Sequence, residues 1–469
     1  MKPLKVLITN NALGERAGSE LYVRDLALGL LRRGHTPILY STVLGEVADE
    51  LRIATIPIVD NLESMSIEPD IIHGHHHLET MTALLRFPSV PAIYLCHGWI
   101  PWEEAPPKFP RVLRYLAVDD LCRERLVIEH GIPDERVGVL LNFVDLDRFR
   151  PRPPLLGRPR RGLVFTNQIL QSRSLEALRQ ACELHGIELE TIGRGFGAAH
   201  SRPEDILANY DIVFAKARAA MEALAVGTAV VLYDKAGLGP MVTSEEFDRL
   251  RSLNFGIRTL AVSRVTTEAV EDQISRYDPV DAARVSSRIR AEAGCDAVVE
   301  NLISLYQEVI WEFGGEGERG ERDMASEGRA AAGYLRWLSP WFKNSVSVER
   351  ALAETQKEAE RAIRERDHVH ALLEAELEKS ETLDHLDDLA RALQLEQHLE
   401  PNQLRTPDDI RRAVRGVEQL KLERDEAQAE LQRIRGTLGW RMLRPYGRIK
   451  HHILLPMLRR LSGRRAAEK

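Results

Sequence analysis

The chain of 469 residues lacks several features that would narrow its class at once. Its four cysteines (Cys96, Cys122, Cys182 and Cys295) are widely spaced without a CxxC pair, which argues against a zinc ribbon and a disulfide scaffold. No run of about 20 uncharged apolar residues is present, so no membrane span is predicted. A formal net charge of only −7 gives no general basis for nucleic-acid binding. With no apolar signal-peptide core near the start, we expect a globular cytoplasmic protein.

Strand-like and helix-like segments alternate from the start of the chain. Lys5–Thr9 is a short apolar run that predicts a strand, and the polar loop after it leads to a helix that begins at Gly18 and Ser19. The Ser19 hydroxyl is suited to cap that helix by accepting from a free backbone N–H. A glycine loop between a strand and a helix N-terminus is a ready anion site, so Gly18 and Ser19 are candidate binding residues.

A second alternation follows the proline-rich segment 150–154. One helix in it carries a single acid, Glu222, and ends at Gly227, where glycine can adopt the left-handed conformation of a helix C-cap. Glu222 is either a ligand-facing acid or an ordinary solvated helix residue. The predicted strands of this half lie near 163–166, 188–192, 212–215 and 229–233.

The segment after the last of these strands is rich in turn-forming residues. We predict a loop at Gly237–Thr243. Ligands of doubly wound sheets bind at the carboxyl ends of the strands, so this loop should share a cleft with Glu222. Gly239, Met241 and Val242 are its candidate binding residues.

Five ordered motifs give the chain a resemblance to a known family. Over residues 1–312 it resembles the glycosyltransferases of the GT-B fold, in particular glycosyltransferase family 4. That resemblance implies two Rossmann-like doubly wound α/β domains facing a cleft, here 1–155 and 156–313. The segments that carry it are Gly18, Ser19, Glu20, Asp25 and Leu26 with 33–35, then 69–73 with His75, then 94–98, 131–137 and 142–149.

The chain also departs from the family pattern. Phe214 stands where the family usually has the first of two glutamates, and Lys216 and Arg218 replace a glycine-rich turn. The usual Gly-Arg and Lys-Gly pairs after the first strand of the second domain are missing from 164–168. Lys216 and Arg218 are plausible substitutes, since either cation can offset the charge of a pyrophosphate.

The resemblance implies a retaining, metal-independent hexosyltransferase without a cofactor. It would move a sugar from a nucleotide-diphosphate sugar to a glycan or lipid-linked acceptor, in surface polysaccharide or glycoconjugate synthesis. The residues expected to act are His97, Lys216 and Arg218 in catalysis, Gly18, Ser19, Glu222, Gly239, Met241 and Val242 on the donor, and His75 and Trp99 on the acceptor side. A sugar-nucleotide epimerase of the same fold and a catalytically silent GT-B scaffold are the alternatives.

The histidine-rich segment and Trp99 can each be interpreted in two ways. The histidine-rich segment His73–His77 invites a metal site, but no carboxylate partner accompanies it, so a histidine at a strand end is the preferred interpretation. Trp99 beside His97 either stacks on a sugar face or packs structurally.

Composition changes after the two predicted domains. The charged, glycine-rich segment at 314–345 predicts a mobile linker. Glu, Arg, Ala and Leu dominate 346–435, which predicts long helices. These helices form either a self-associating coiled coil or an antiparallel pair.

The tail at 436–469 is basic and amphipathic. From Gln432 onward, 11 Lys and Arg residues stand against one acid, Glu468, and they alternate with anchors such as Trp440 and Tyr446. This pattern predicts a segment that lies on an anionic membrane, which would place the protein at the inner face of the cytoplasmic membrane. A partner-binding helix and a fortuitously basic surface are the alternatives.

Overall fold

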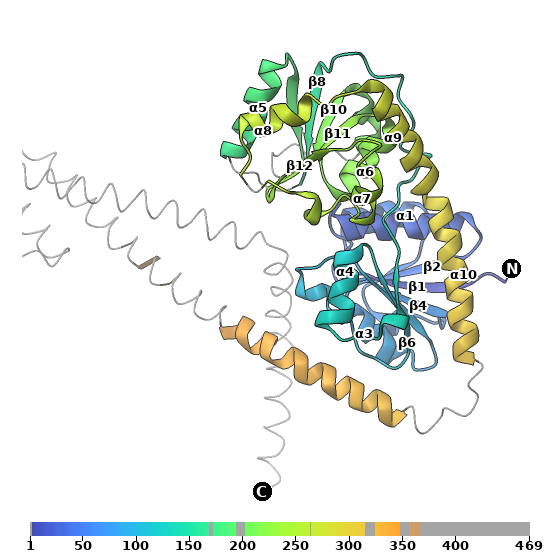
Figure 1. Ribbon diagram of the computed structural model, residues 1–469. Coiled ribbons are helices and arrows are strands. Elements are labelled where there is room, and N and C mark those ends of the chain that lie inside the picture. The colour runs from blue at the N-terminus through green and yellow to red at the C-terminus, as the bar shows by residue number, and fades with distance from the viewer. Residues whose placement is uncertain are drawn as a thin grey trace, which may run out of the picture. The chain divides into compact units, whose positions relative to one another are not determined.

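The computed structural model contains two β-sheets, each covered by helices (Figure 1). Both belong to one compact unit that extends to Tyr334, and the residues from Leu335 onward belong to a second unit. The α/β class predicted from the sequence is therefore confirmed. The structure describes residues 2–167, 172–193, 202–262, 264–314 and 324–347, and positions 357, 360, 361 and 364.

The first sheet is parallel throughout, in the order β3-β2-β1-β4-β5-β6-β7. Its central strands are buried on both faces, which is why they read as continuous apolar runs in the sequence. The order reverses between β1 and β4, so their carboxyl ends form the place where a doubly wound sheet binds ligands. The strands are β1 (Lys5–Thr9), β2 (Thr36–Tyr40), β3 (Ile58–Val59), β4 (Ile71–Gly74), β5 (Ala92–Cys96), β6 (Val112–Ala117) and β7 (Val137–Val139).

The helices of the first domain lie between these strands. The first begins at Gly18 as predicted, but the predicted capping role of Ser19 is wrong. Ala17 holds the N-cap position, and the Ser19 hydroxyl donates to Glu20 Oε2 at 3.0 Å instead. The helices are α1 (Gly18–Arg32), α2 (Glu46–Ile53), α3 (His77–Arg86) and α4 (Asp120–Glu124), with short helical turns at Leu62–Ser64, Trp102–Glu104, Arg125–Glu129 and Asp134–Arg136.

The second sheet has the order β12-β11-β10-β8-β9 and is parallel except for the edge strand β12, which is antiparallel to β11. All four predicted strands are present. The loop predicted at Gly237–Thr243 is wrong, because Gly237–Met241 pairs antiparallel with β11. Pro240 is tolerated there because it lies in an edge strand, where a residue without an N–H need not donate to a further strand. The strands are β8 (Arg161–Phe165), β9 (Glu188–Ile192), β10 (Ile212–Ala215), β11 (Ala229–Asp234) and β12 (Gly237–Met241).

The second domain contains the helix that the sequence predicts to carry Glu222 and to end at Gly227. The helix α6 ends at Gly227 with φ of 99°, which confirms the predicted left-handed C-cap. The helices are α5 (Ser172–Leu184), α6 (Ala217–Val226), α7 (Phe247–Ser252), α8 (Thr267–Ile274), α9 (Pro279–Glu292) and α10 (Cys295–Gly314), with short helical turns at Pro203–Asp205, Leu207–Asn209 and Ile257–Thr259.

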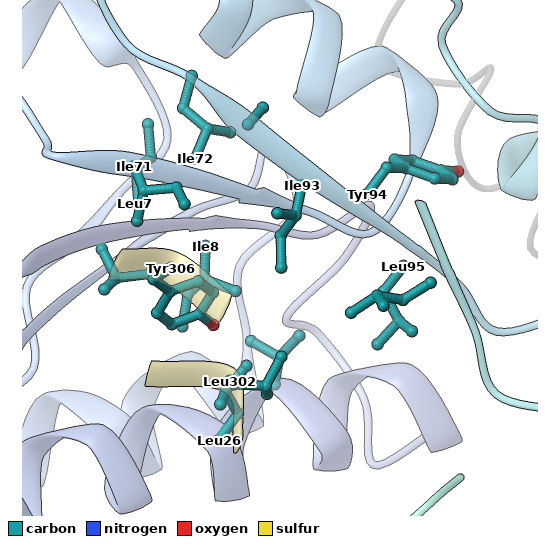
Figure 2. Close-up of a cluster of buried hydrophobic side chains, with 14 of the residues drawn as sticks. Leu7, Ile8, Leu26, Ile71, Ile72, Ile93, Tyr94, Leu95, Leu302 and Tyr306 are labelled. Atoms are coloured by element: carbon teal, nitrogen blue, oxygen red, sulfur yellow. The ribbon is translucent and has the colours of Figure 1, made fainter. Parts of the chain in front are cut away.

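The last of these helices returns to the first domain. Figure 1 shows α10 in yellow running from the second sheet along the first, and its apolar face joins the first domain's core. Figure 2 shows Leu302 and Tyr306 of α10 in the same cluster as Ile8 of β1, Leu26 of α1 and Ile93 of β5. The core of the first domain is thus completed by residues that follow the second domain in the sequence.

Residues 324–347 are helical, although the sequence predicts a linker over 314–345. The glycine-rich composition that suggested a linker gives way after Gly328 to alanine, arginine and leucine, which are strong helix formers. The predicted helical region at 346–435 lies largely outside the described residues, and the tail at 436–469 lies wholly outside them, so both stay predictions. Within the described ranges, no helix is both long and apolar enough to cross a membrane.

The packing of α10 on α1 can be tested at Gly29. A Cβ at this position would lie 2.8 Å from Val299 Cγ2, so Gly29→Ala should lower the free energy of unfolding by about 1–3 kcal/mol, as overpacking does. The double variant Gly29→Ala/Val299→Ala should lose less than the sum of the two single variants. Gly18→Ala is the control, because a Cβ there meets nothing within 4 Å. Chemical denaturation would measure all four, and equal losses for Gly29→Ala and Gly18→Ala would contradict this packing.

Candidate functional site

The candidate site is built from loops at the carboxyl ends of parallel strands in both domains. Asn10 follows β1, His75 follows β4 and His97 follows β5, while Lys216 follows β10 in the second domain. The second sheet also reverses its order, between β8 and β10. Both topological switch points, where α/β sheets bind ligands, therefore contribute residues that the sequence singled out.

The two domains are joined by a buried group of charges, here called the interdomain ion network. Asp25 of α1 is at its centre and is 1% exposed. Arg24 Nε and Nη2 donate to Asp25 Oδ1 at 2.8 and 2.6 Å, and Arg218 Nη2 of α6 donates to Asp25 Oδ2. Arg148 Nη1 lies 3.6 Å from Asp25 Oδ1. The network comprises Arg24, Asp25, Arg148, Glu204, Arg218 and Glu222.

The charges in this network are set by two opposing effects. Burial alone would raise the pKa of Asp25, but Arg218, Arg24 and Arg148 outweigh it and hold the pKa below its usual value. Burial raises the pKa of Glu222, against the opposing effect of Arg218. Asp25 is therefore the firmly ionised carboxylate through which the arginines are held.

Glu222 and Arg218 differ from their predicted surroundings. Glu222 is 4% exposed, and its Oε1 accepts from Arg218 Nε at 2.8 Å. The alternative of a solvated helix residue is thus wrong, while the predicted donor-binding role of Glu222 stays a prediction. Arg218 is occupied by Glu222 and Asp25, so the structure gives it a role in joining the domains. Its predicted role toward a phosphate stays a prediction.

Lys216 stands directly before α6 and forms an ion pair with Asp234 at the end of β11. The next residue, Ala217, has φ of 48°, in the left-handed region that favours glycine. Its N–H donates to the Phe255 carbonyl at 2.8 Å, which helps to hold this conformation. A residue other than glycine thus adopts the left-handed conformation at this turn, with Lys216 on one side of it and Arg218 on the other.

Three imidazoles of the first domain lie in a row, and they are here called the histidine stack. His73 and His75 are stacked with ring centroids 4.5 Å apart and an interplanar angle of 14°, whereas His97 lies edge to edge with His75, with centroids 4.9 Å apart and an angle of 11°. His75 Nδ1 and His97 Nε2 are 2.6 Å apart, within hydrogen-bond distance. His73 Nδ1 is 2.6 Å from the Tyr306 hydroxyl of α10.

Burial keeps the histidine stack neutral at physiological pH. It lowers the pKa of His73 to about 3 and that of His97 to about 4, in the second case against the opposing effect of Glu104. Burial also places the pKa of His75 well below its usual value. The backbone N–H of His97 donates to Glu104 Oε2 at 2.8 Å, which fixes the main chain beside the ring.

The histidine stack and the interdomain ion network meet at α1. Tyr22 is 1% exposed, and its ring centroid is 4.8 Å from that of His97. Asp25, three residues further along the same helix, is paired with Arg218 of α6, so α1 contacts both groups. The structure therefore brings together His97, His75, Arg218 and Glu222, which the sequence placed in one cleft.

The other predicted site residues lie in different surroundings. Gly18 and Ser19 begin α1, and Trp99 is 47% exposed in the loop after β5. Met241 and Val242, at the end of β12 and just beyond it, are each 3% exposed. Gly239 is also buried, with the Thr259 carbonyl oxygen 2.5 Å from where a Cβ would be. The side chains of Met241 and Val242 face the core and Gly239 has none, so any binding role of these three residues would depend on their backbone groups.

Two questions remain for the site: whether it can hold a metal ion, and which of its residues the sequence does not reveal. Among the residues that the structure describes, no group of three or more His, Cys, Asp or Glu side chains could hold a metal ion, and this includes His73–His77. The sequence does not reveal the centre of the network, although Asp25 belongs to one of the motifs that carry the resemblance. The signal was two adjacent charges, Arg24 and Asp25, within a helix whose other buried residues are mostly apolar. Nothing in the sequence connects Tyr306 to His73.

Comparison with known proteins gives one match to a family model. Residues 16–148 match the model described as Glycosyltransferase Family 4. This part of the chain is therefore similar to that family, in agreement with the resemblance seen in the sequence. No curated protein matches the chain by sequence.

Solved structures show the same kind of likeness at low identity. A glycosyltransferase from Rickettsia africae is 14% identical, with 66% of this chain and 99% of that chain covered and a TM-score of 0.49. HepE of Anabaena, in complex with UDP and glucose, is 14% identical, with 65% and 100% covered and a TM-score of 0.46. The catalytic domain of starch synthase IV from Arabidopsis thaliana, bound to ADP and acarbose, is 11% identical, with 66% and 100% covered and a TM-score of 0.40.

The interdomain ion network can be tested at its central carboxylate. Asp25→Asn keeps the shape but leaves the arginines without their buried counter-charge, so it should lower the free energy of unfolding by about 3–5 kcal/mol. The losses of Asp25→Asn and Arg218→Gln should be less than additive in the double variant, because both changes remove the same ion pair. Asp49→Asn, which alters an exposed ion pair with Arg52, should cost less than about 1 kcal/mol. Chemical denaturation measures each variant, and similar losses for Asp25→Asn and Asp49→Asn would exclude a central role for Asp25.

Proposed function

We propose that the chain is a retaining glycosyltransferase that uses a nucleotide-diphosphate sugar. The family match over residues 16–148 supports the class. The observation that carries the proposal is that α6 is paired through Arg218 with Asp25 of α1, the helix whose Tyr22 packs against His97 of the first domain. A donor held by the second domain would thereby have its reacting end next to a residue of the first.

The charges of the second domain suit the leaving group of this reaction. Transfer breaks the bond between sugar and phosphate, and negative charge grows on the phosphate oxygens as it breaks. Cations and backbone N–H groups that are already in place stabilise that charge best. Lys216 stands at the N-terminus of the ten-residue helix α6, where the helix dipole also favours an anion. Lys216 is therefore assigned to the donor phosphates, at the cost of its pair with Asp234.

The acceptor belongs, in this proposal, to the first domain. His97 and the exposed Trp99 follow β5, so a glycan or lipid-linked acceptor would meet an imidazole and an indole from one loop. The route is the same-face one that the resemblance implies, since no other residue stands out as an obligatory nucleophile. Surface polysaccharide or glycoconjugate synthesis is the setting that such an acceptor suggests.

A panel of nucleotide sugars tests this function directly. The purified full-length chain should bind at least one of the UDP-, GDP- or ADP-linked hexoses by calorimetry and release nucleoside diphosphate when a suitable acceptor is added. Lys216→Met should weaken that binding by roughly 10- to 100-fold, the range of a lost charge-assisted hydrogen bond. Lys235→Met is the matched control, because it removes the same charge from an exposed position at the end of the neighbouring strand β11.

The outcomes of this panel separate the alternatives. Conversion of a nucleotide sugar without any acceptor would indicate a sugar-nucleotide epimerase. Absence of binding across the panel would leave a catalytically silent scaffold. Equal binding by the Lys216→Met and Lys235→Met variants would move the phosphate site elsewhere.

We further propose that the basic tail at 436–469 holds the enzyme on an anionic membrane, where a lipid-linked acceptor would be concentrated. The argument is the sequence pattern alone, 11 basic residues against one acid after Leu431, because the tail lies outside the described residues. Liposome co-sedimentation should bring down the full chain with anionic vesicles, and a chain ending at Leu431 should stay in solution. High salt should weaken the attachment, since screening acts over about 8–10 Å. Equal sedimentation of the two chains would instead favour a partner-binding helix.

A further inference from the structure

The histidine stack contains a hydrogen bond whose direction decides what His97 can do. His75 Nδ1 and His97 Nε2 are 2.6 Å apart, and one of them must carry the proton. Both rings are neutral, so each has one N–H and one bare nitrogen. Only two arrangements are therefore possible for this pair.

The surroundings of His75 distinguish these two arrangements. His75 is 0% exposed, and its Nε2 has no hydrogen-bond partner among the residues that the structure describes. If His75 were protonated on Nε2, a buried N–H donor would be left unpaired, which is rare in proteins. If His75 is protonated on Nδ1, Nε2 is only an unpaired acceptor and the proton lies in the short contact with His97.

The direction of this hydrogen bond fixes the protonation of Nδ1, the other ring nitrogen of His97. When His97 Nε2 accepts from His75, the proton of the neutral His97 ring is on Nδ1. His97 is only partly buried, whereas His73 and His75 are fully enclosed, so His97 is the member of the stack that a ligand can reach. We propose that His75 is a positioning residue that holds His97 in the Nδ1–H form, so that His97 acts as a hydrogen-bond donor to a ligand oxygen. This assignment deepens the proposed transferase function and rests on it for the identity of that oxygen.

The chemistry that follows differs from general base catalysis. A histidine that presents N–H cannot take a proton from an acceptor hydroxyl through that nitrogen. It can donate to an oxygen on which negative charge grows, or to a sugar oxygen that must be held in place. The stacking of His73 behind His75 limits rotation of the rings, so the preference is built into the fold before a ligand arrives.

Nitrogen NMR of the full-length chain with labelled histidine imidazoles reads the tautomer of His97 without any ligand. We expect His97 in the native chain to be protonated on Nδ1. His75→Phe keeps a stacked ring but removes the hydrogen bond, and it should shift the proton of His97 wholly or partly to Nε2. His75→Asn provides an amide N–H in place of the imidazole donor and should restore the Nδ1–H form.

His77→Phe is the matched control, because it removes another buried imidazole from the same segment whose Nδ1 contact is with Tyr334 and not His97. Its His97 should remain protonated on Nδ1. A proton on His97 Nε2 in the native chain, or an unchanged tautomer in His75→Phe, would overturn the proposal. Since the measurement needs no substrate, an Nδ1–H His97 in a chain that binds no nucleotide sugar would count against the proposed function and leave the positioning role standing.

Discussion

The carboxylate of Asp25 is the point on which the arrangement of the two domains depends. It lies in a helix of the first domain, is buried, and is paired with an arginine from the same helix, one from the connection between domains and one from α6. A buried charge of this kind is stabilising only while its partners stay in place, because an unpaired charge in the interior is costly. The domains are therefore held by an interaction that tolerates little change in its geometry.

The same network determines which residues are open to a ligand. Arg218 and Glu222, both expected to contact a donor, are turned toward each other and toward Asp25. Lys216 is left at the start of α6 with Asp234 as its partner. The left-handed Ala217 separates these two cations, so that one joins the domains and the other stays with the strand ends of its own sheet. One unusual residue conformation thus divides a structural charge from a candidate binding charge.

The sequence predicts the two sheets well and the site less well. Strands such as Ile212–Ala215 are continuous apolar runs because both faces are buried, and a left-handed cap at Gly227 follows from the properties of glycine. Gly237–Met241 is rich in glycine and proline yet is a strand, because tertiary pairing with β11 outweighs local preference. The partners of Asp25 and His73 come from distant parts of the chain, and no local pattern reveals which charges or rings will meet across such separations. The linker predicted at 314–345 is likewise wrong over 324–345, which is helical. That prediction gave weight to the glycines and overlooked the helix-forming residues among them.

The return of α10 to the first domain has a consequence for how the protein is made. The core residues of α10, among them Val299, Leu302 and Tyr306, join buried residues that all precede β8, so they leave the ribosome only after the whole second domain. Until then all strands of the first domain have been synthesised, but the apolar face of α10 that covers part of its core is still missing. A nascent chain at that stage exposes surface that invites chaperone binding or aggregation. Folding of the first domain therefore finishes last, even though its sequence comes first.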